Sequence, residues 1–182
     1  MKAAAFIDRD GVINEERGFV HRSADFEFIP GSVQALRALQ AAGYQLVVIT
    51  NQSGIARGMY SEAQYHELEA HMRARLAESG VTLDSVQYCP HLPDATDPRY
   101  RNDCECRKPR PGMILAAVRL LDIDAARSIL IGDRLADIEA GRAGGVGRCF
   151  LVRSGRPLSE SDVQLADGVF ENLAACVAAL PR

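Results

Sequence analysis

The sequence lacks several features that would assign the protein to other functional classes. Its 182 residues carry a net charge of −3, so there is no basic excess of the kind that bulk nucleic-acid binding requires. No apolar run approaches the roughly 20 residues of a membrane-spanning helix. Only seven residues precede Asp8 and they fit a strand, so we expect no signal peptide. These absences predict a cytoplasmic protein with neither nucleic acid nor membrane as a partner.

Internal repeats, low-complexity tracts and linker-like segments are also missing. The length is that of one domain with a complete hydrophobic core. A hydrophobic content of 47% and a charged content of 25% are typical of globular proteins. We therefore expect residues 1–182 to form a single domain, and we expect a monomer.

Apolar segments of strand length alternate with amphipathic segments along the chain. The strands are predicted at residues 3–7, 45–50, 85–88, 127–131, 148–152 and 168–170, and the helices at residues 32–42, 61–80, 111–121, 135–143 and 171–180. The first strands are continuously apolar, as in parallel sheets covered on both faces. This pattern predicts a doubly wound, Rossmann-like α/β fold with helices on both faces of a parallel sheet. Residues 11–30 show no period and are predicted to form a long flap beside the site.

Polar side chains follow three of the predicted strands at their carboxyl ends. Asp8 and Asp10 follow the first strand, Thr50 ends the second, and Asp133 follows the fourth. Because the carboxyl ends of parallel strands meet at one edge of a sheet, these groups are expected to converge there. Lys108, just before the third predicted helix, is expected to join them. Carboxylates beside a lysine and a hydroxyl fit a site for Mg²⁺ and a phosphate.

These residue types predict a phosphoryl-transfer mechanism. No serine–histidine arrangement is visible, so the candidate nucleophile is the Asp8 carboxylate, which can form an acyl phosphate. Asp10 can protonate the leaving oxygen and then deprotonate water. Mg²⁺ is expected on Asp8, Asp133 and the backbone carbonyl of Asp10, whereas the role of Asp137 stays open. Thr50, the amides after it and Lys108 would hold the phosphoryl oxygens.

A cluster of cysteine and histidine lies between the third strand and Lys108. Cys89, His91, Cys104 and Cys106 supply three thiolates and one imidazole, a set typical of closed structural Zn²⁺ sites. The segment between them has little to bury, so we expect the insertion at residues 89–106 to need the metal for its order. A chance coincidence of reduced residues is the alternative. A second alternative is a zinc finger that binds nucleic acid, but no basic helix follows the ligands.

Four motifs in this order resemble those of the haloacid dehalogenase superfamily. They are Asp8-Arg9-Asp10-Gly11-Val12, Thr50 after an apolar strand, Lys108, and residues 132–137 (GDRLAD). Within that superfamily, residues 50–58 (TNQSGIARG) and 104–109 (CECRKP) resemble the D-glycero-D-manno-heptose 1,7-bisphosphate 7-phosphatases, over about residues 3–155. Histidinol-phosphate phosphatases share much of this pattern and remain the alternative.

The resemblance implies Mg²⁺-dependent hydrolysis of the 7-phosphate of a heptose bisphosphate, in nucleotide-activated heptose synthesis for lipopolysaccharide. It implies that Asp8 is the nucleophile, Asp10 the acid and base, and Asp133 a metal ligand. Thr50 and Lys108 would stabilise the phosphoryl group.

The spacing of the motifs leaves no room for a large cap domain, so short elements must select the substrate. The predicted substrate-binding residues are Glu16, Arg17, Gly18, Phe19, Asn51, Gln52, Ser53, Arg57, Arg107 and Arg134. Arg107, with Arg57 or Arg134, suits a second anionic group, because a guanidinium can bind two phosphate oxygens at once. We therefore expect the small-molecule partner to be a sugar bisphosphate.

Overall fold

The computed structural model describes residues 1–181, which form a six-stranded parallel sheet between helices. The strand order is β3-β2-β1-β4-β5-β6. The strands are β1 (Ala4–Ile7), β2 (Gln45–Asn51), β3 (Ser85–Cys89), β4 (Ile129–Gly132), β5 (Arg148–Val152) and β6 (Gly168–Phe170). The chain runs outward from β1 in one direction and then crosses to β4, so the strand order reverses between β1 and β4. Open α/β sheets bind ligands at such a reversal.

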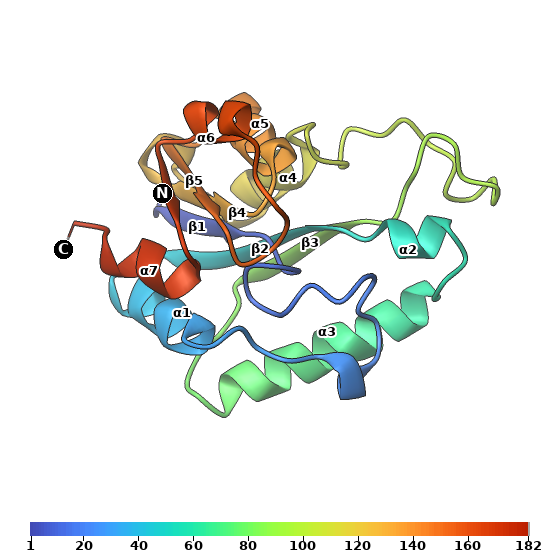
Figure 1. The fold of residues 1–182 in the computed structure, drawn as a ribbon, viewed down its shortest axis with the longest axis horizontal. Coiled ribbons are helices and arrows are strands. Elements are labelled where there is room, and N and C mark those ends of the chain that lie inside the picture. Colours follow the sequence, from blue (N-terminus) through green and yellow to red (C-terminus); the bar gives the residue numbers. More distant parts are fainter. Residues whose placement is uncertain (182) are drawn as a thin grey trace.

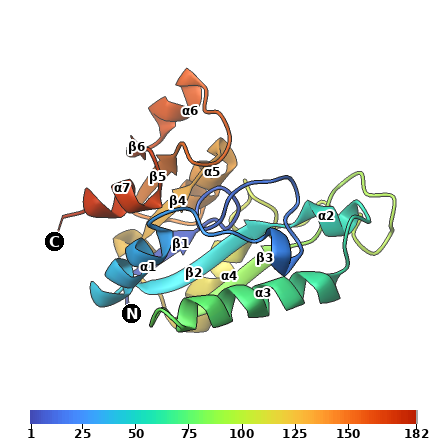
Figure 2. The same cartoon turned by 60° about the horizontal axis from the view of Figure 1, so that its bottom comes forward.

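Helices cover both faces of the sheet (Figure 1), and the doubly wound α/β prediction is confirmed. They are α1 (Ser32–Ala41), α2 (Ser53–Ala56), α3 (Glu62–Ala77), α4 (Gly112–Leu121), α5 (Leu135–Ala143), α6 (Glu160–Leu165) and α7 (Leu173–Ala178). Figure 2 shows α1, α3 and α7 on one side of the strands and α4 on the other. None of the helices in residues 1–181 is both long enough and apolar enough to cross a membrane.

Alternate residues of the strands supply two separate cores. Ala5 and Ile7 of β1 join the cluster that contains side chains of α1, α3 and α7. Ala4 and Phe6 of the same strand join the cluster under α4 and α5. Both clusters are almost completely buried, which is why β1 has no polar residue before Asp8.

Several element boundaries differ from the sequence-based prediction. Strand β4 begins at Ile129 because Ala125–Arg127 form a 3₁₀ helix whose first turn is capped by the Asp124 carboxylate. The last helix begins at Leu173 because the Asn172 side chain caps it. The short helices α2 and α6 were not predicted, since fewer than two helical turns produce no readable period. A capping box of Ser61 and Gln64 begins α3.

Candidate active site

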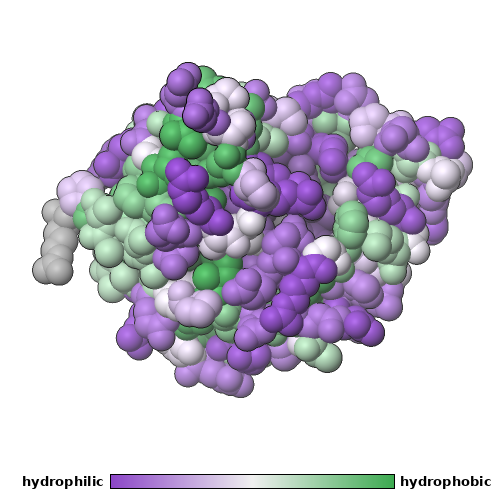
Figure 3. All heavy atoms as spheres, in the orientation of Figure 1, coloured by the Kyte–Doolittle hydropathy of each residue, from purple (hydrophilic) through white to green (hydrophobic). Residues whose placement is uncertain are grey.

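A pocket of about 360 Å³ lies at the carboxyl ends of the strands, beside the point where the strand order reverses. Figure 3 shows hydrophilic residues around the hollow on this side of the molecule. The pocket brings together most of the predicted site residues. Its lining includes Asp8, Asp10, Glu16, Phe19, Thr50, Asn51, Gln52, Ser53, Arg57, Arg107, Lys108 and Arg134.

Asp8 and Lys108 form the centre of the pocket floor. The Lys108 Nζ lies 3.0 Å from Asp8 Oδ1, and it donates a hydrogen bond of 2.9 Å to the Ile49 carbonyl. Asp8 Oδ1 also accepts the Arg9 backbone N–H at 2.8 Å, so Oδ2 remains the carboxylate oxygen open to an incoming group. Burial raises the pKa of Asp8 well above its usual range, and Lys108 opposes this rise.

Asn51 fixes the position of Lys108 through its backbone. The Asn51 amide donates to the Lys108 carbonyl at 3.1 Å and accepts the Lys108 N–H at 3.1 Å. Burial alone would lower the pKa of Lys108, but the carboxylates of Asp137 and Asp8 outweigh burial and raise it. The ammonium is therefore charged at neutral pH and held against the site of attack.

Asp133 offers a buried oxygen that suits a metal ion. Its Oδ2 accepts the Arg156 N–H at 3.1 Å, whereas Oδ1 has no hydrogen-bond partner among residues 1–181. Burial and the neighbouring Asp137 raise the pKa of Asp133 to about 6. Asp8, Asp133 and Asp137 each place a carboxylate oxygen within 4.8 Å of the others. An unsatisfied buried carboxylate oxygen among such neighbours fits a hard divalent cation.

Two glycines allow the backbone to close around Asp133. A Cβ on Gly11, which has a positive φ of 85°, would lie 2.7 Å from Asp133 Oδ2. A Cβ on Gly155 would lie 2.1 Å from the same oxygen. Both loops therefore approach the carboxylate more closely than any side chain permits.

Asp10 is held by a network of donors at the side of the pocket. The Arg9 guanidinium binds both of its oxygens at 2.9 Å, Asn14 donates to Oδ1 at 3.0 Å, and Gln52 donates to Oδ2 at 3.0 Å. Gln52 also donates to Thr50 Oγ1 at 2.8 Å. The Thr50 hydroxyl hydrogen is therefore free to point at a phosphoryl oxygen.

Four arginines surround the entrance to the pocket. Arg57 stacks on Phe19, with its guanidinium carbon 6.0 Å from the ring centre. Arg107 makes one hydrogen bond, of 3.3 Å, to the His91 carbonyl. The other two, Arg134 and Arg156, lie 3.2 and 4.0 Å from Glu16 Oε2.

Two predicted substrate-binding residues do not line the pocket, and three lining residues were missed. Arg17 pairs with Glu27 on the flap surface, and the Gly18 N–H donates to Glu16 Oε1 at 2.8 Å. The missed residues are Tyr60, whose hydroxyl donates to Gln52 Oε1 at 2.5 Å, Ala136 of α5, and Arg156. Arg156 follows the carboxyl end of β5, the same signal that identified Asp8 and Asp133.

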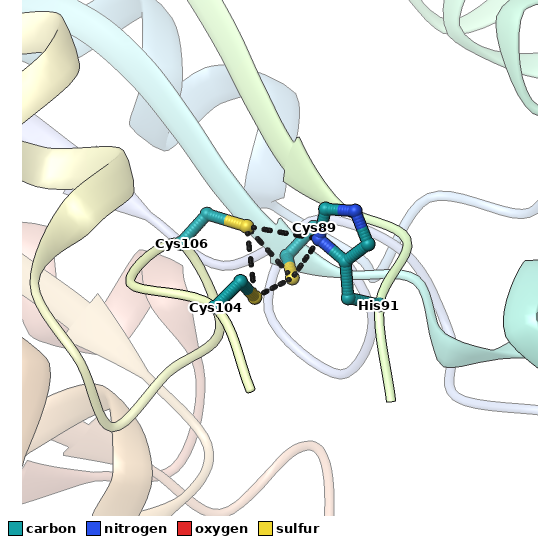
Figure 4. Close-up of side chains that lie close together, drawn as sticks. All are labelled: Cys89, His91, Cys104 and Cys106. Atoms are coloured by element: carbon teal, nitrogen blue, oxygen red, sulfur yellow. Dashed lines mark hydrogen bonds between the residues drawn. The ribbon is translucent and has the colours of Figure 1, made fainter. Parts of the chain in front are cut away.

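The four predicted ligands of the insertion lie together (Figure 4). Cys106 Sγ lies 3.0 Å from Cys89 Sγ and 3.2 Å from Cys104 Sγ, and His91 Nδ1 lies 3.5 Å from Cys106 Sγ. All the cysteines are free thiols. The hydrogen bond between Cys106 and Cys89 lowers the pKa of Cys106 to about 5, which favours the thiolate that binds metal. Three sulfurs and one imidazole nitrogen converging in this way fit Zn²⁺.

The chain is similar to known proteins over nearly its whole length. Residues 5–85 match the model of the haloacid dehalogenase-like hydrolases, and residues 105–176 match a second HAD-hydrolase-like model. The D-glycero-beta-D-manno-heptose-1,7-bisphosphate 7-phosphatase of Photorhabdus laumondii is 47% identical over 94% of this chain and 91% of its own. The enzyme of that name from Vibrio cholerae is 46% identical over 94% of this chain and 92% of its own.

A solved structure extends the likeness to the fold. The D,D-heptose 1,7-bisphosphate phosphatase of B. bronchiseptica, complexed with magnesium and phosphate, superposes with a TM-score of 0.82 at 35% identity. The match covers 98% of this chain and 97% of that one. The chain therefore belongs to the haloacid dehalogenase-like hydrolases, in the family of the heptose 1,7-bisphosphate 7-phosphatases.

Proposed function

We propose that the protein is a Mg²⁺-dependent phosphatase that removes the 7-phosphate from D-glycero-D-manno-heptose 1,7-bisphosphate. The observation that carries the proposal is Asp8, whose Oδ1 is held by Lys108 at 3.0 Å while Oδ2 stays open to the pocket. The names of the similar proteins supply the substrate. The product would serve nucleotide-activated heptose synthesis for lipopolysaccharide.

The first half-reaction forms a phospho-aspartate. Asp8 Oδ2 attacks the phosphorus of the 7-phosphate, an O–P bond forms, and the bond from phosphorus to the sugar O7 breaks. Protonated Asp10 gives its proton to O7, so the sugar leaves as a neutral alcohol. Lys108 and the Thr50 hydroxyl stabilise the charge on the other phosphoryl oxygens.

The second half-reaction restores the enzyme. Asp10, now a carboxylate, takes a proton from a water molecule whose oxygen attacks the phosphorus. The bond between phosphorus and Asp8 then breaks, and inorganic phosphate leaves. One aspartate thus acts as acid and then as base, which requires it to reach both the leaving oxygen and the water.

Mg²⁺ would be held by Asp8, the free Oδ1 of Asp133 and the Asp10 backbone carbonyl. It would offset the repulsion between the Asp8 carboxylate and the phosphate, since metal ions stabilise phosphoryl charge. Asp137 is a weaker candidate ligand, because its Oδ2 accepts the backbone N–H groups of Asp133 and Arg134 at 3.1 Å each.

Zn²⁺ on Cys89, His91, Cys104 and Cys106 would act as a structural metal. All four coordination positions would be filled by protein, which leaves none for substrate. The loop that carries Cys104 and Cys106 leads directly into Arg107 and Lys108. Order in this loop therefore supports the position of two cations of the active site.

The arginines at the entrance support a bisphosphate rather than an aminated substrate. Arg57 and Arg107 form no ion pair among the described residues, so their charge is available to a second phosphate. Histidinol phosphate carries a cationic amine that these side chains would repel. We further propose that the enzyme acts as a monomer in the cytoplasm, where thiol ligands stay reduced.

The test compares heptose 1,7-bisphosphate, heptose 7-phosphate and histidinol phosphate as substrates, with and without Mg²⁺. We expect kcat/KM for the bisphosphate to exceed that for histidinol phosphate by at least about 10²-fold, equivalent to about 2.7 kcal/mol. Phosphate release measured with and without added Mg²⁺ gives the metal dependence. Equal kcat/KM values for the bisphosphate and histidinol phosphate would contradict the proposal.

A further inference from the structure

Arg9 lies between the two motif aspartates but is not part of the pocket surface. Its side chain is 2% exposed, and it is among the largest fully buried side chains of the protein. The residues that line the pocket include Asp8 and Asp10 on either side of it but not Arg9. A buried guanidinium normally requires a specific partner, because desolvation of the charge is costly.

The partner of Arg9 is the Asp10 carboxylate. Arg9 Nη2 lies 2.9 Å from both Asp10 oxygens, and Nε lies 3.2 Å from Oδ1. The same Nη2 donates to the Val20 carbonyl at 2.8 Å, so the guanidinium is anchored to the flap as well. The Tyr65 ring lies under it, with its centre 5.9 Å from the guanidinium carbon.

Two further residues donate hydrogen bonds to the Asp10 carboxylate, and they place one of its oxygens, Oδ2, on the pocket side. Asn14, which is completely buried, donates to Oδ1 at 3.0 Å. Oδ2 accepts from Gln52, which itself lines the pocket and also binds Thr50. Arg9 and Asn14 together therefore fix the plane of the carboxylate and direct Oδ2 toward the reacting group, since a planar guanidinium restrains both oxygens at once.

We propose that Arg9 is a positioning residue for the reaction, which holds the Asp10 carboxylate so that Oδ2 meets the leaving oxygen. This inference rests on the proposed function, in which Asp10 donates a proton to that oxygen. Arg9 itself touches no substrate and exchanges no proton. The proton passes from Asp10 to the leaving oxygen, and Arg9 stays charged throughout.

The dependence on the leaving group tests this role. A poor leaving group needs the proton from Asp10, whereas 4-nitrophenolate leaves as a stable anion. For Arg9→Met we expect kcat/KM to fall by roughly 10²-fold with heptose bisphosphate and with phenyl phosphate, the lower range of general acid catalysis. With 4-nitrophenyl phosphate we expect a fall of less than about tenfold, because little proton transfer is needed. The inhibition constant Ki of inorganic phosphate, the product, should stay within about threefold of the wild-type value, since Arg9 does not contact the phosphoryl group.

Two further variants separate positioning from folding. Arg9→Lys keeps the buried charge but cannot bind both carboxylate oxygens, so it should show the same selective loss. Arg73→Met is the matched control, because Arg73 also binds a carboxylate, Glu69 at 2.9 Å, and a backbone carbonyl, Leu83 at 2.9 Å, away from the pocket. It should leave the ratio of kcat/KM values for the two aryl phosphates unchanged.

A double-mutant cycle shows whether Arg9 acts through Asp10. In the Asp10→Asn background, Arg9→Met should lower kcat/KM for phenyl phosphate by less than about threefold, against the roughly 10²-fold loss expected in the wild-type background, because the group it positions is already lost. An equal loss on all substrates, or the same additional loss in both backgrounds, would overturn the inference and leave the proposed function intact. Failure of the wild-type enzyme to hydrolyse any of the phosphates would overturn both.

Discussion

The Lys108 ammonium lies 2.6 Å from Asp137 Oδ1, and both side chains are almost completely buried. The second Asp137 oxygen accepts the N–H groups of Asp133 and Arg134, which directly precede helix α5. Asp137 thus joins the phosphate-binding lysine to the loop that carries the candidate metal ligand. Both of its oxygens accept hydrogen bonds or pair with Lys108, whereas Asp133 Oδ1 accepts no hydrogen bond from the described residues and lies 3.6 Å from Arg134 Nε. The geometry favours an orienting role for Asp137.

We predict that Asp137→Asn destabilises the protein by about 2 kcal/mol and lowers kcat. The amide oxygen can still accept the two N–H groups, but the NH₂ group then faces the Lys108 ammonium, and a charge-assisted hydrogen bond is lost. Urea unfolding and steady-state kinetics measure the two effects. Asp162→Asn, which alters a capping box on the surface of α6, is the control and should cost less than about 1 kcal/mol. Equal losses for the two variants would contradict the prediction.

We predict that Asp8→Asn abolishes turnover while the fold and the metal site remain. An amide is too weak a nucleophile to form the covalent intermediate. Phosphate release and the circular dichroism spectrum measure the two properties. Retention of a tenth of the wild-type rate, an effect of only about 1.4 kcal/mol, would contradict nucleophilic catalysis once contaminating phosphatases are excluded.

We predict that the two metals respond differently to chelation. EDTA should stop catalysis quickly and reversibly, because a Mg²⁺ site with few protein ligands exchanges readily. Zinc should remain near one per chain, because a Cys₃His set encloses it. Elemental analysis before and after chelation measures both. Protein purified without chelators and found free of zinc would contradict the structural site.

The zinc site can also be tested by mutation. Cys104→Ala should lower both the zinc content and kcat, since the loop that sets Arg107 and Lys108 loses a ligand. Cys176→Ala is the control, because Cys176 is a buried core residue of α7 far from the insertion. It should leave the zinc content unchanged.

The sequence predicted the groups that lie at strand ends because local order and topology together determine their positions. Asp8, Thr50 and Asp133 each follow or end an apolar strand, and parallel pairing of β1 with β2 and β4 brings them together. Lys108 was predicted from its place just before a helix and from its motif, but its position at the site depends on the Asn51 side chain, which binds its backbone. Such a contact between distant loops has no local sequence signature.

The missed residues show the same limit. Tyr60 reaches Gln52 because the turn after α2 folds back over Gly54, where a Cβ would lie 2.2 Å from the tyrosine ring. Arg156 followed a predicted strand and was open to the argument that identified the aspartates. The helices α2 and α6 span four and six residues, too few for a period to be read.

We predict that Asp167→Asn destabilises the protein by about 1 kcal/mol at neutral pH and by less in acid. The Asp167 carboxylate accepts the Cys149 N–H at 2.7 Å and lies 2.8 Å from Arg142. Burial alone would raise the pKa of Asp167, but these partners outweigh it and hold the pKa below its usual value of 3.8. Its stabilisation is therefore complete above the unfolded value and is lost as the pH falls through the lower folded value. The urea midpoints of the wild type and the variant should differ at about pH 7 and lie closer together at about pH 3. The same difference at both pH values would contradict the prediction.

We predict that Arg107→Ala removes most of the preference for a bisphosphate over a monophosphate. Within residues 1–181 the Arg107 guanidinium makes a single hydrogen bond, to the His91 carbonyl at 3.3 Å, so most of its donors are available to substrate. Arg156 lies 4.0 Å from Glu16, which offsets part of its charge, so Arg156→Ala should cost less. For Arg107→Ala we expect the ratio of kcat/KM values for heptose 1,7-bisphosphate and heptose 7-phosphate to fall by about 10²-fold, the loss of a paired charged contact worth about 2–3 kcal/mol. Turnover of 4-nitrophenyl phosphate should change little, since Lys108 still holds the phosphate under attack.

Arg99→Ala, which removes an exposed arginine paired with Asp97, is the control and should leave the ratio unchanged. Parallel losses on all three substrates would show instead that Arg107 supports Lys108, and the second phosphate would then have to be bound by Arg57 or Arg134.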